Sequence, residues 1–100
     1  MSTGYLFDPV YLQHYQRGHV EGPERLDHIN QALDATGLRD RLVALTPEPI
    51  SVERLARVHT PEHIQRVKSV AQRGGGGLKS MGDETYVAPR SYDAALLAAG

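Results

Sequence analysis

Apolar residues recur at helical spacing in two otherwise polar stretches of the chain. In the first they are Leu26, Ile29 and Leu33, and in the second they are Ile64, Val67 and Ala71. Each stretch opens with proline followed by glutamate and closes near a glycine, which are the ordinary signals for the start and the end of a helix. The pattern predicts one helix over about 23–36 and another from 61 to about 74.

Two short apolar runs are expected to be extended instead. Residues 4–7 are aromatic and apolar and stop at Asp8-Pro9, and residues 42–45 are followed by a stretch with two prolines. Both runs therefore predict short strands. The remaining expected elements are one or two helical turns within 11–17, a helix over 52–58 capped by Ser51, and a short extended piece at 85–87.

The last segment, residues 92–99, follows a potential cap at Ser91 and contains an unbroken apolar run from Ala94 to Ala99. A helix made from it has almost no polar face and must be enclosed by other elements. A parallel sheet needs several strands, whereas the sequence offers two convincing candidates. We therefore expect the chain to end inside an α/β domain. The alternative is a small helical domain with a frayed apolar tail.

Composition narrows the function classes. Hydrophobic residues make up 40% and charged residues 23% of the chain, as in ordinary soluble globular proteins. A formal charge of −1 gives no basic excess, so we expect no nucleic-acid or membrane partner. The absence of cysteine excludes disulfides and thiolate sites. The N-terminus has no signal-peptide or membrane-span pattern, and the expected location is cytoplasmic.

Three motifs that could carry chemistry are weak. His59 and His63 match the HxxEH pattern of a metalloprotease class, but Thr60-Pro61 looks like a cap and a first helical residue. His59 is therefore expected to lie before the helix and not to share a face with His63. The run Gly74–Gly77 lacks the glycine that a phosphate loop needs before its lysine, and it predicts a flexible linker. The histidines at 14, 19 and 28 lack ligand-type partners and are interpreted as surface or hydrogen-bonded residues.

Four ordered stretches resemble the start of the deacetylase domain in the histone deacetylase and acetylpolyamine amidohydrolase superfamily. They are Phe7-Asp8-Pro9 with Tyr11-Leu12 and His14, Gly18-His19 through Leu26, Val58 to Ile64, and Gly82 to Gly100. Each is weak alone, but the ordered set is specific and covers essentially all of the chain. Gly22 and His63 stand where many relatives carry a bulkier or aromatic residue, which leaves the subfamily open.

The resemblance implies an α/β fold, the N-terminal portion of an arginase- and deacetylase-like three-layer architecture with a central parallel sheet. In such enzymes two aspartates and a histidine bind zinc, a histidine pair serves as acid and base, and a tyrosine polarises the acyl carbonyl. None of those motifs occurs in this sequence. Residues 1–100 are therefore expected to be an N-terminal fragment of a single deacetylase domain, truncated before the metal site, with no catalytic residue and no zinc ligand of its own.

The implied function is zinc-dependent hydrolysis of N-acetyl or other N-acyl amides on lysine side chains or polyamines, carried out by the complete enzyme. The 100-residue piece alone is expected to be inactive. Self-association is left open. The alternative is a non-catalytic fragment or pseudo-domain that binds a partner through its apolar last helix.

Three residues are expected to contribute to the site by this resemblance. Glu84, with Asp83 as its rival, lies in a loop expected to form the rim of the substrate tube and to hold substrate N–H groups. Arg25 is expected to line an internal channel suited to acetate release, because a guanidinium binds a carboxylate in two-pronged fashion. The alternatives are that both acids are solvated loop residues and that Arg25 forms a surface salt bridge with Glu21 or Asp27.

Overall fold

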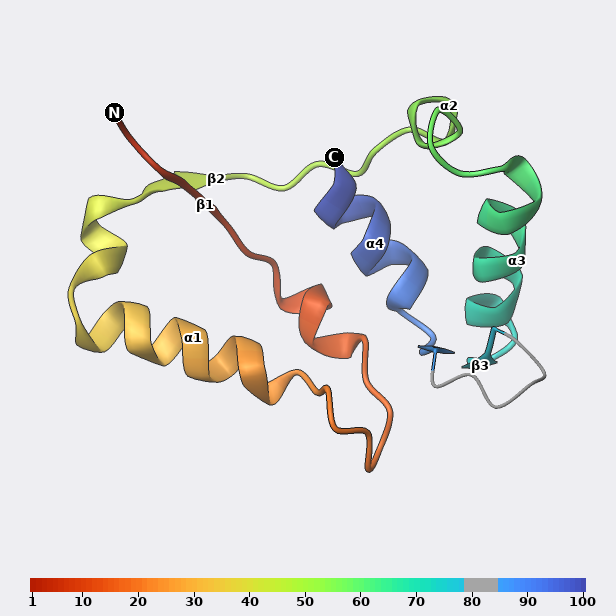
Figure 1. The fold of residues 1–100 in the computed structure, drawn as a ribbon, viewed down its shortest axis with the longest axis horizontal. Coiled ribbons are helices and arrows are strands. Elements are labelled where there is room, and N and C mark those ends of the chain that lie inside the picture. Colours follow the sequence, from red (N-terminus) through yellow and green to blue (C-terminus); the bar gives the residue numbers. More distant parts are fainter. Residues whose placement is uncertain (79–84) are drawn as a thin grey trace.

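The computed structural model describes residues 1–78 and 85–100. In chain order its elements are β1 (Gly4–Leu6), the 3-10 helix η1 (Pro9–Gln13), α1 (Glu24–Ala35), the 3-10 helix η2 (Leu38–Arg41), β2 (Val43–Leu45), α2 (Val52–Leu55), α3 (Pro61–Gln72), β3 (Gly76–Gly77), β4 (Tyr86–Val87) and α4 (Ser91–Ala99) (Figure 1). The two amphipathic helices and the two apolar strands predicted from the sequence are present as α1, α3, β1 and β2.

Strands β1 and β2 pair in parallel and lie side by side, with Tyr5 opposite Ala44 (Figure 1). Because parallel strands need a crossover connection, the chain between them passes through η1, α1 and η2. A second pair, β3 with β4, is antiparallel. Helices combined with a parallel sheet confirm the predicted α/β class.

Helix α1 stops where the sequence predicts and is fixed to β1 through Tyr5. Gly37, just after the C-terminal cap Thr36, takes a left-handed φ of 72°, which ends the helix. The Tyr5 hydroxyl donates a hydrogen bond to the Asn30 side chain. The Arg39 guanidinium lies 5.0 Å from the centre of the Tyr5 ring. Because α1 has no buried residue, these contacts supplement a partly exposed apolar face.

Helices α2 and α3 begin at the predicted caps, but α2 is shorter than expected. Ser51 and Thr60 each accept a side-chain hydrogen bond from the backbone N–H three residues further on. The helix predicted over 52–58 ends at Leu55. The next backbone groups form tighter bonds, such as Val58 N–H to the Leu55 carbonyl at 3.1 Å, that close turns instead of continuing an α-helix.

The glycine run at 74–77 takes part in a sheet, and the prediction of a flexible linker there is wrong. Its last two residues form β3, and the first three have positive φ values of 101°, 97° and 149°. The N–H of Gly75 donates to the Val70 carbonyl at 2.9 Å. A Cβ on Gly75 would lie 2.6 Å from the Val87 carbonyl oxygen. Glycine is therefore required both for the turn and for the close approach to β4.

Helix α4 begins one residue earlier than predicted, and Ser91 does not act as its cap. Ser91 is the first helical residue, and the cap position belongs to Arg90, which makes no side-chain capping bond. The Ser91 hydroxyl instead accepts a hydrogen bond from the Ala88 N–H at 2.7 Å. The hydroxyl therefore turns away from the helix and toward the preceding loop.

The buried apolar residues form a small core. They are Val10, Ile64, Val70, Ala71, Val87, Ala88 and Ala94. At its centre Val70, Ala71 and Val87 pack together, and Val67, Leu78 and Tyr92 pack against them. This core joins α3 to the segment around β4.

Residues 1–78 and 85–100 cover only part of the apolar surface of α4. The helix lies between η1 and α3 (Figure 1), yet Ala94 is its one buried apolar residue. On the sheet, Val43 and Leu45 are about half exposed, at 49% and 51%. Apolar surface is therefore uncovered on both the sheet and the last helix. Within the described ranges, no helix is both long enough and apolar enough to cross a membrane.

We predict that Val70→Ala lowers the free energy of unfolding by about 2 kcal/mol, because it removes methyl groups from a side chain that is 3% exposed. Val58→Ala is the matched control at 82% exposure and should change it by less than about 0.5 kcal/mol. Urea unfolding followed by circular dichroism measures both. Equal losses in the two variants would contradict the core described here.

Candidate functional site at the Arg25 cavity

A cavity of about 140 Å³ lies where the start of α1 meets η1 and β4. Its lining residues are Tyr11, His14, Glu21, Gly22, Pro23, Arg25, Leu26 and Tyr86. Arg25, selected from the sequence as a channel residue, is thus in the wall of a cavity.

The backbone at the start of α1 fixes the position of Arg25. Its N–H donates to the Gly22 carbonyl at 3.3 Å, which closes the turn leading into the helix. The Glu24 side chain folds over Gly22 so closely that a Cβ there would lie 2.1 Å from a carboxylate oxygen. Within the described residues Arg25 forms no ion pair with Glu21 or Asp27. Its guanidinium is therefore not committed to either of the carboxylates considered from the sequence.

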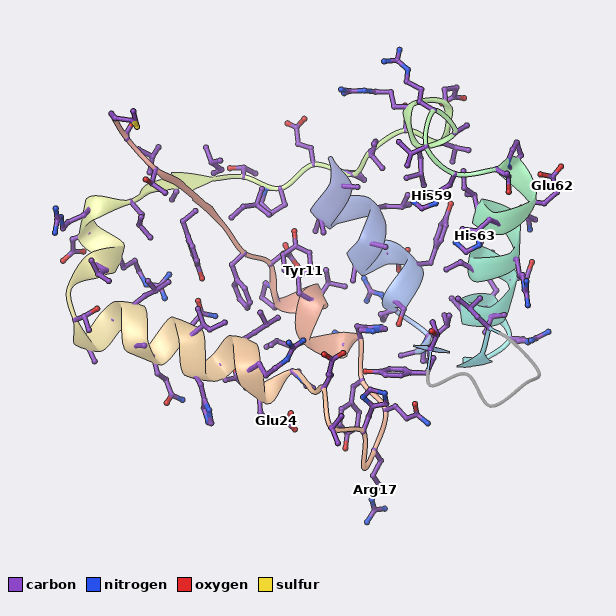
Figure 2. All side chains as sticks on the ribbon, viewed as in Figure 1. Tyr11, Arg17, Glu24, His59, Glu62 and His63 are labelled. Atoms are coloured by element: carbon purple, nitrogen blue, oxygen red, sulfur yellow. The ribbon has the colours of Figure 1, made fainter. Side chains whose placement is uncertain are left out.

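Tyr11 is a second residue that lines the same cavity. Its hydroxyl is buried and has no hydrogen-bond partner among the described residues. Burial, with a smaller contribution from Asp8, raises the pKa of Tyr11. Figure 2 shows Tyr11 in the interior of the molecule, whereas Arg17 points outward from the tip of the loop.

Sequence reasoning missed the role of Tyr11, which it used as part of a motif and not as a site residue. Two signals could have identified it. Tyr11 comes shortly after Asp8-Pro9 in the first ordered motif, and it falls within the predicted helical turns of 11–17. The remaining information, the proximity of Tyr11 to Arg25, comes from the fold.

A second, more open cavity of about 500 Å³ borders the first. It is lined by His14, His19, Val20, Glu21, Thr85 and Tyr86. The His14 and Tyr86 rings stack with centroids 4.6 Å apart and planes 5° apart, and His19 meets Tyr86 at 4.9 Å. His14 and His19, interpreted from the sequence as isolated histidines, therefore gather around one tyrosine.

Burial, and next the neighbouring His19, lowers the pKa of His14. Its Nδ1 lies 2.6 Å from the Ser91 hydroxyl oxygen, which places the ring against the first turn of α4. His14 is therefore a neutral, hydrogen-bonded side chain at neutral pH.

His59 and His63 approach each other more closely than predicted. The helix does begin at Pro61, after the extended Thr60, as the sequence indicates. The two rings nevertheless lie with their centroids 5.3 Å apart. Both rings line an apolar groove of about 170 Å³ between α3 and α4. The expectation that they share no face is wrong.

The metalloprotease arrangement is nevertheless not assembled at this pair. Figure 2 shows Glu62 pointing away from His59 and His63. In residues 1–78 and 85–100, no group of three or more His, Cys, Asp or Glu side chains is placed to hold a metal ion. The two predicted substrate-binding acids, Glu84 and Asp83, lie outside the described residues.

Comparison with known proteins identifies relatives across most of the chain. The model of the histone deacetylase domain family matches residues 19–100. A histone deacetylase-like amidohydrolase of Pseudomonas aeruginosa is 39% identical over 83 residues, covering 83% of this chain and 21% of that protein. A probable deacetylase of Methanothermobacter thermautotrophicus is 33% identical over 95 residues, covering 95% of this chain and 27% of that protein.

Human polyamine deacetylase HDAC10 is 33% identical over 84 residues, covering 81% of this chain and 13% of that protein. Among solved structures, the HDA15 HD domain superposes with a TM-score of 0.86 at 31% identity, covering 99% of this chain and 29% of that one. The chain thus spans between about an eighth and less than a third of the length of these relatives. The match over residues 19–100 confirms the resemblance found in the sequence: this chain belongs to the histone deacetylase family.

Proposed function

We propose that this chain is the N-terminal part of a single deacetylase domain and that the complete enzyme hydrolyses N-acetyl or other N-acyl amides on lysine side chains or polyamines. Family membership over residues 19–100 supports the hydrolytic activity. The similarity to a polyamine deacetylase and to a histone deacetylase-like amidohydrolase supports both substrate classes. The single observation that carries the role of this segment is that Arg25 lies in the wall of a cavity.

Zinc belongs to the remainder of the domain in this proposal. In the described residues, no three or more His, Cys, Asp or Glu side chains are grouped so that they could hold it. None of these side chains is therefore assigned to this metal. When bound, the metal supplies Lewis-acid activation of the amide carbonyl and of water. The contribution of residues 1–100 is to shape the cavity wall and to bind groups that enter or leave.

Arg25 is suited to receive the carboxylate that amide hydrolysis releases. A guanidinium donates two parallel N–H bonds to a carboxylate. Arg25 lines a cavity of about 140 Å³, which is large enough for an acetate-sized ligand. We assign this cavity to product release.

Glu84, with Asp83 as its rival, is proposed to accept hydrogen bonds from substrate N–H groups at the rim. The proposed enzyme is cytoplasmic and needs neither nucleic acid nor a membrane. A self-associated form is compatible with its exposed apolar surface.

A second candidate function is a non-catalytic interaction module. The uncovered apolar surface of α4 and of the β1–β2 sheet favours it, because such patches mark contact sites. The cavity favours the enzyme, since a contact surface has no need of an arginine in a cavity wall.

The first prediction from the proposed function concerns metal. The chain alone should retain no stoichiometric zinc after dialysis, because two surface histidines are too few for a stable zinc site. Elemental analysis measures the zinc content, and His59→Ala is the control for weak surface binding. One tightly held zinc per chain, lost in His59→Ala, would overturn the assignment of the metal to the rest of the domain.

The second prediction concerns Arg25. In a chimaera where this chain replaces the matching segment of the Pseudomonas aeruginosa relative, Arg25→Ala should lower kcat about tenfold, equivalent to about 1.4 kcal/mol. It should also weaken inhibition by added acetate. Arg17→Ala removes an arginine that points outward in Figure 2. It should leave both kcat and the inhibition by acetate unchanged. An Arg25→Ala chimaera with unaltered acetate inhibition would contradict the product-release role.

The third prediction concerns the rim. In the same chimaera Glu84→Ala should reduce kcat/KM by about ten- to a hundredfold, because hydrogen bonds to a charged acceptor contribute about 1.5–3 kcal/mol each. Asp83→Ala should do much less, and zinc content should not change. Equal, negligible effects on acyl-lysine and acyl-polyamine substrates would show that neither acid holds the substrate.

A further inference from the structure

His59 and His63 form a pair of imidazoles that the proposed function does not use. Their ring centroids lie 5.3 Å apart, and the ring planes are tilted by 32°. Both side chains line the apolar groove between α3 and α4, and Figure 2 shows them on the side of α3 that faces α4, whereas Glu62 points away. The family resemblance gives this chain no zinc ligand, so a role for the pair depends on its own geometry.

Backbone hydrogen bonds hold both histidines in place. The His59 N–H donates to the Leu55 carbonyl at 3.1 Å, which ties His59 to the end of α2. The His63 N–H donates to the Thr60 hydroxyl at 3.2 Å, in the capping bond that opens α3. A ligand shared by the two side chains would therefore order few additional residues.

The ring nitrogens of the pair are available to a ligand. Among the described residues, neither imidazole makes a side-chain hydrogen bond or an ion pair, and both residues are exposed. Each ring can therefore rotate about its bond to Cβ and direct a nitrogen toward a shared ion. Neutral imidazole is the commonest protein ligand of transition metals.

The separation of the rings matches that of two ligands on one tetrahedral ion. In such zinc sites the imidazole nitrogen lies about 2.0–2.1 Å from the metal, and the ring centre lies roughly 1.2 Å beyond the nitrogen. Two rings on one tetrahedral ion therefore have centres about 5.3 Å apart, whereas a right angle between them gives about 4.6 Å. The centroid distance of 5.3 Å in the structure fits the tetrahedral value.

We propose that His59 and His63 form a zinc site that exchanges its metal with the solution. Water fills the other positions on the ion, because no third His, Cys, Asp or Glu side chain among residues 1–78 and 85–100 joins the pair. Two protein ligands are too few to retain zinc through dialysis, in agreement with the absence of stoichiometric zinc expected there. The bound ion fastens the segment before α3 to the first turn of that helix. Whether the complete enzyme deacetylates its substrate does not affect this site.

The test titrates zinc into the 100-residue chain and follows labelled histidine by NMR. The ring signals of His59 and His63 should respond together with one midpoint, and the other histidines should not share it. Magnesium prefers oxygen ligands and should leave both rings unchanged. Separate midpoints for the two rings would overturn the proposal, because binding of one shared ion gives both rings the same midpoint.

Three variants separate a shared site from the general affinity of histidine for zinc. His59→Ala should weaken zinc binding at His63 about tenfold or more, because the second ligand no longer binds within the same molecule. The double change Glu62→His with His63→Ala keeps the number of histidines but places one where the Glu62 side chain points away from the groove in Figure 2. Its zinc affinity should fall by a similar factor. His28→Ala removes an exposed histidine of α1 and should leave the affinity unchanged.

Thermal unfolding gives a second measurement of the same site. Because zinc binds the folded pair, it should raise the midpoint of unfolding in the parent chain and in His28→Ala, and should not raise it in the other two variants. Circular dichroism without zinc checks the fold of each variant. His59→Phe keeps a ring beside the groove and replaces His59→Ala if the alanine variant is unfolded. Zinc affinity equal to that of the parent in the double change would refute the site.

Discussion

The bond between the Ser91 hydroxyl and His14 Nδ1 connects the beginning of the described chain to its end. Ser91 is the buried polar side chain of the described core, and its hydroxyl makes hydrogen bonds to both the Ala88 N–H and His14 Nδ1. A buried hydroxyl that lost either partner would carry a desolvation penalty of about 1–3 kcal/mol. The geometry of η1 against α4, and with it the shape of the Arg25 cavity, therefore depends on this residue keeping both bonds.

The parts of the fold that sequence alone predicted are those set by local chemistry. The proline and glutamate at the start of α3 and the left-handed Gly37 after α1 are signals that neighbouring residues complete among themselves. The Gly74–Gly77 run was mispredicted because its conformation is set by Val70 and Val87, which contact it through backbone atoms. A glycine run has the same sequence whether it is a linker or a strand at close approach.

The same distinction between local signals and distant contacts applies to the candidate site. Resemblance selected Arg25, and the structure places it in a cavity, but no local pattern indicates that Tyr86 stacks on a histidine 72 positions earlier. The His59 and His63 rings also lie 5.3 Å apart, although His59 precedes the helix that contains His63, and spacing rules do not represent this contact. Contacts between distant segments follow from tertiary packing, and the motifs supply only the residues that make them.

The parallel pairing of β1 with β2 also constrains how this chain acquires its shape. Gly4 pairs with Val43, so thirty-nine positions separate two residues that must meet. Closing so long a loop has an entropic cost, and pairing between strands this distant in sequence is slower than the formation of local contacts. During synthesis the first strand therefore waits until the second emerges. Throughout that interval its backbone polar groups are unpaired and accessible to any other extended chain.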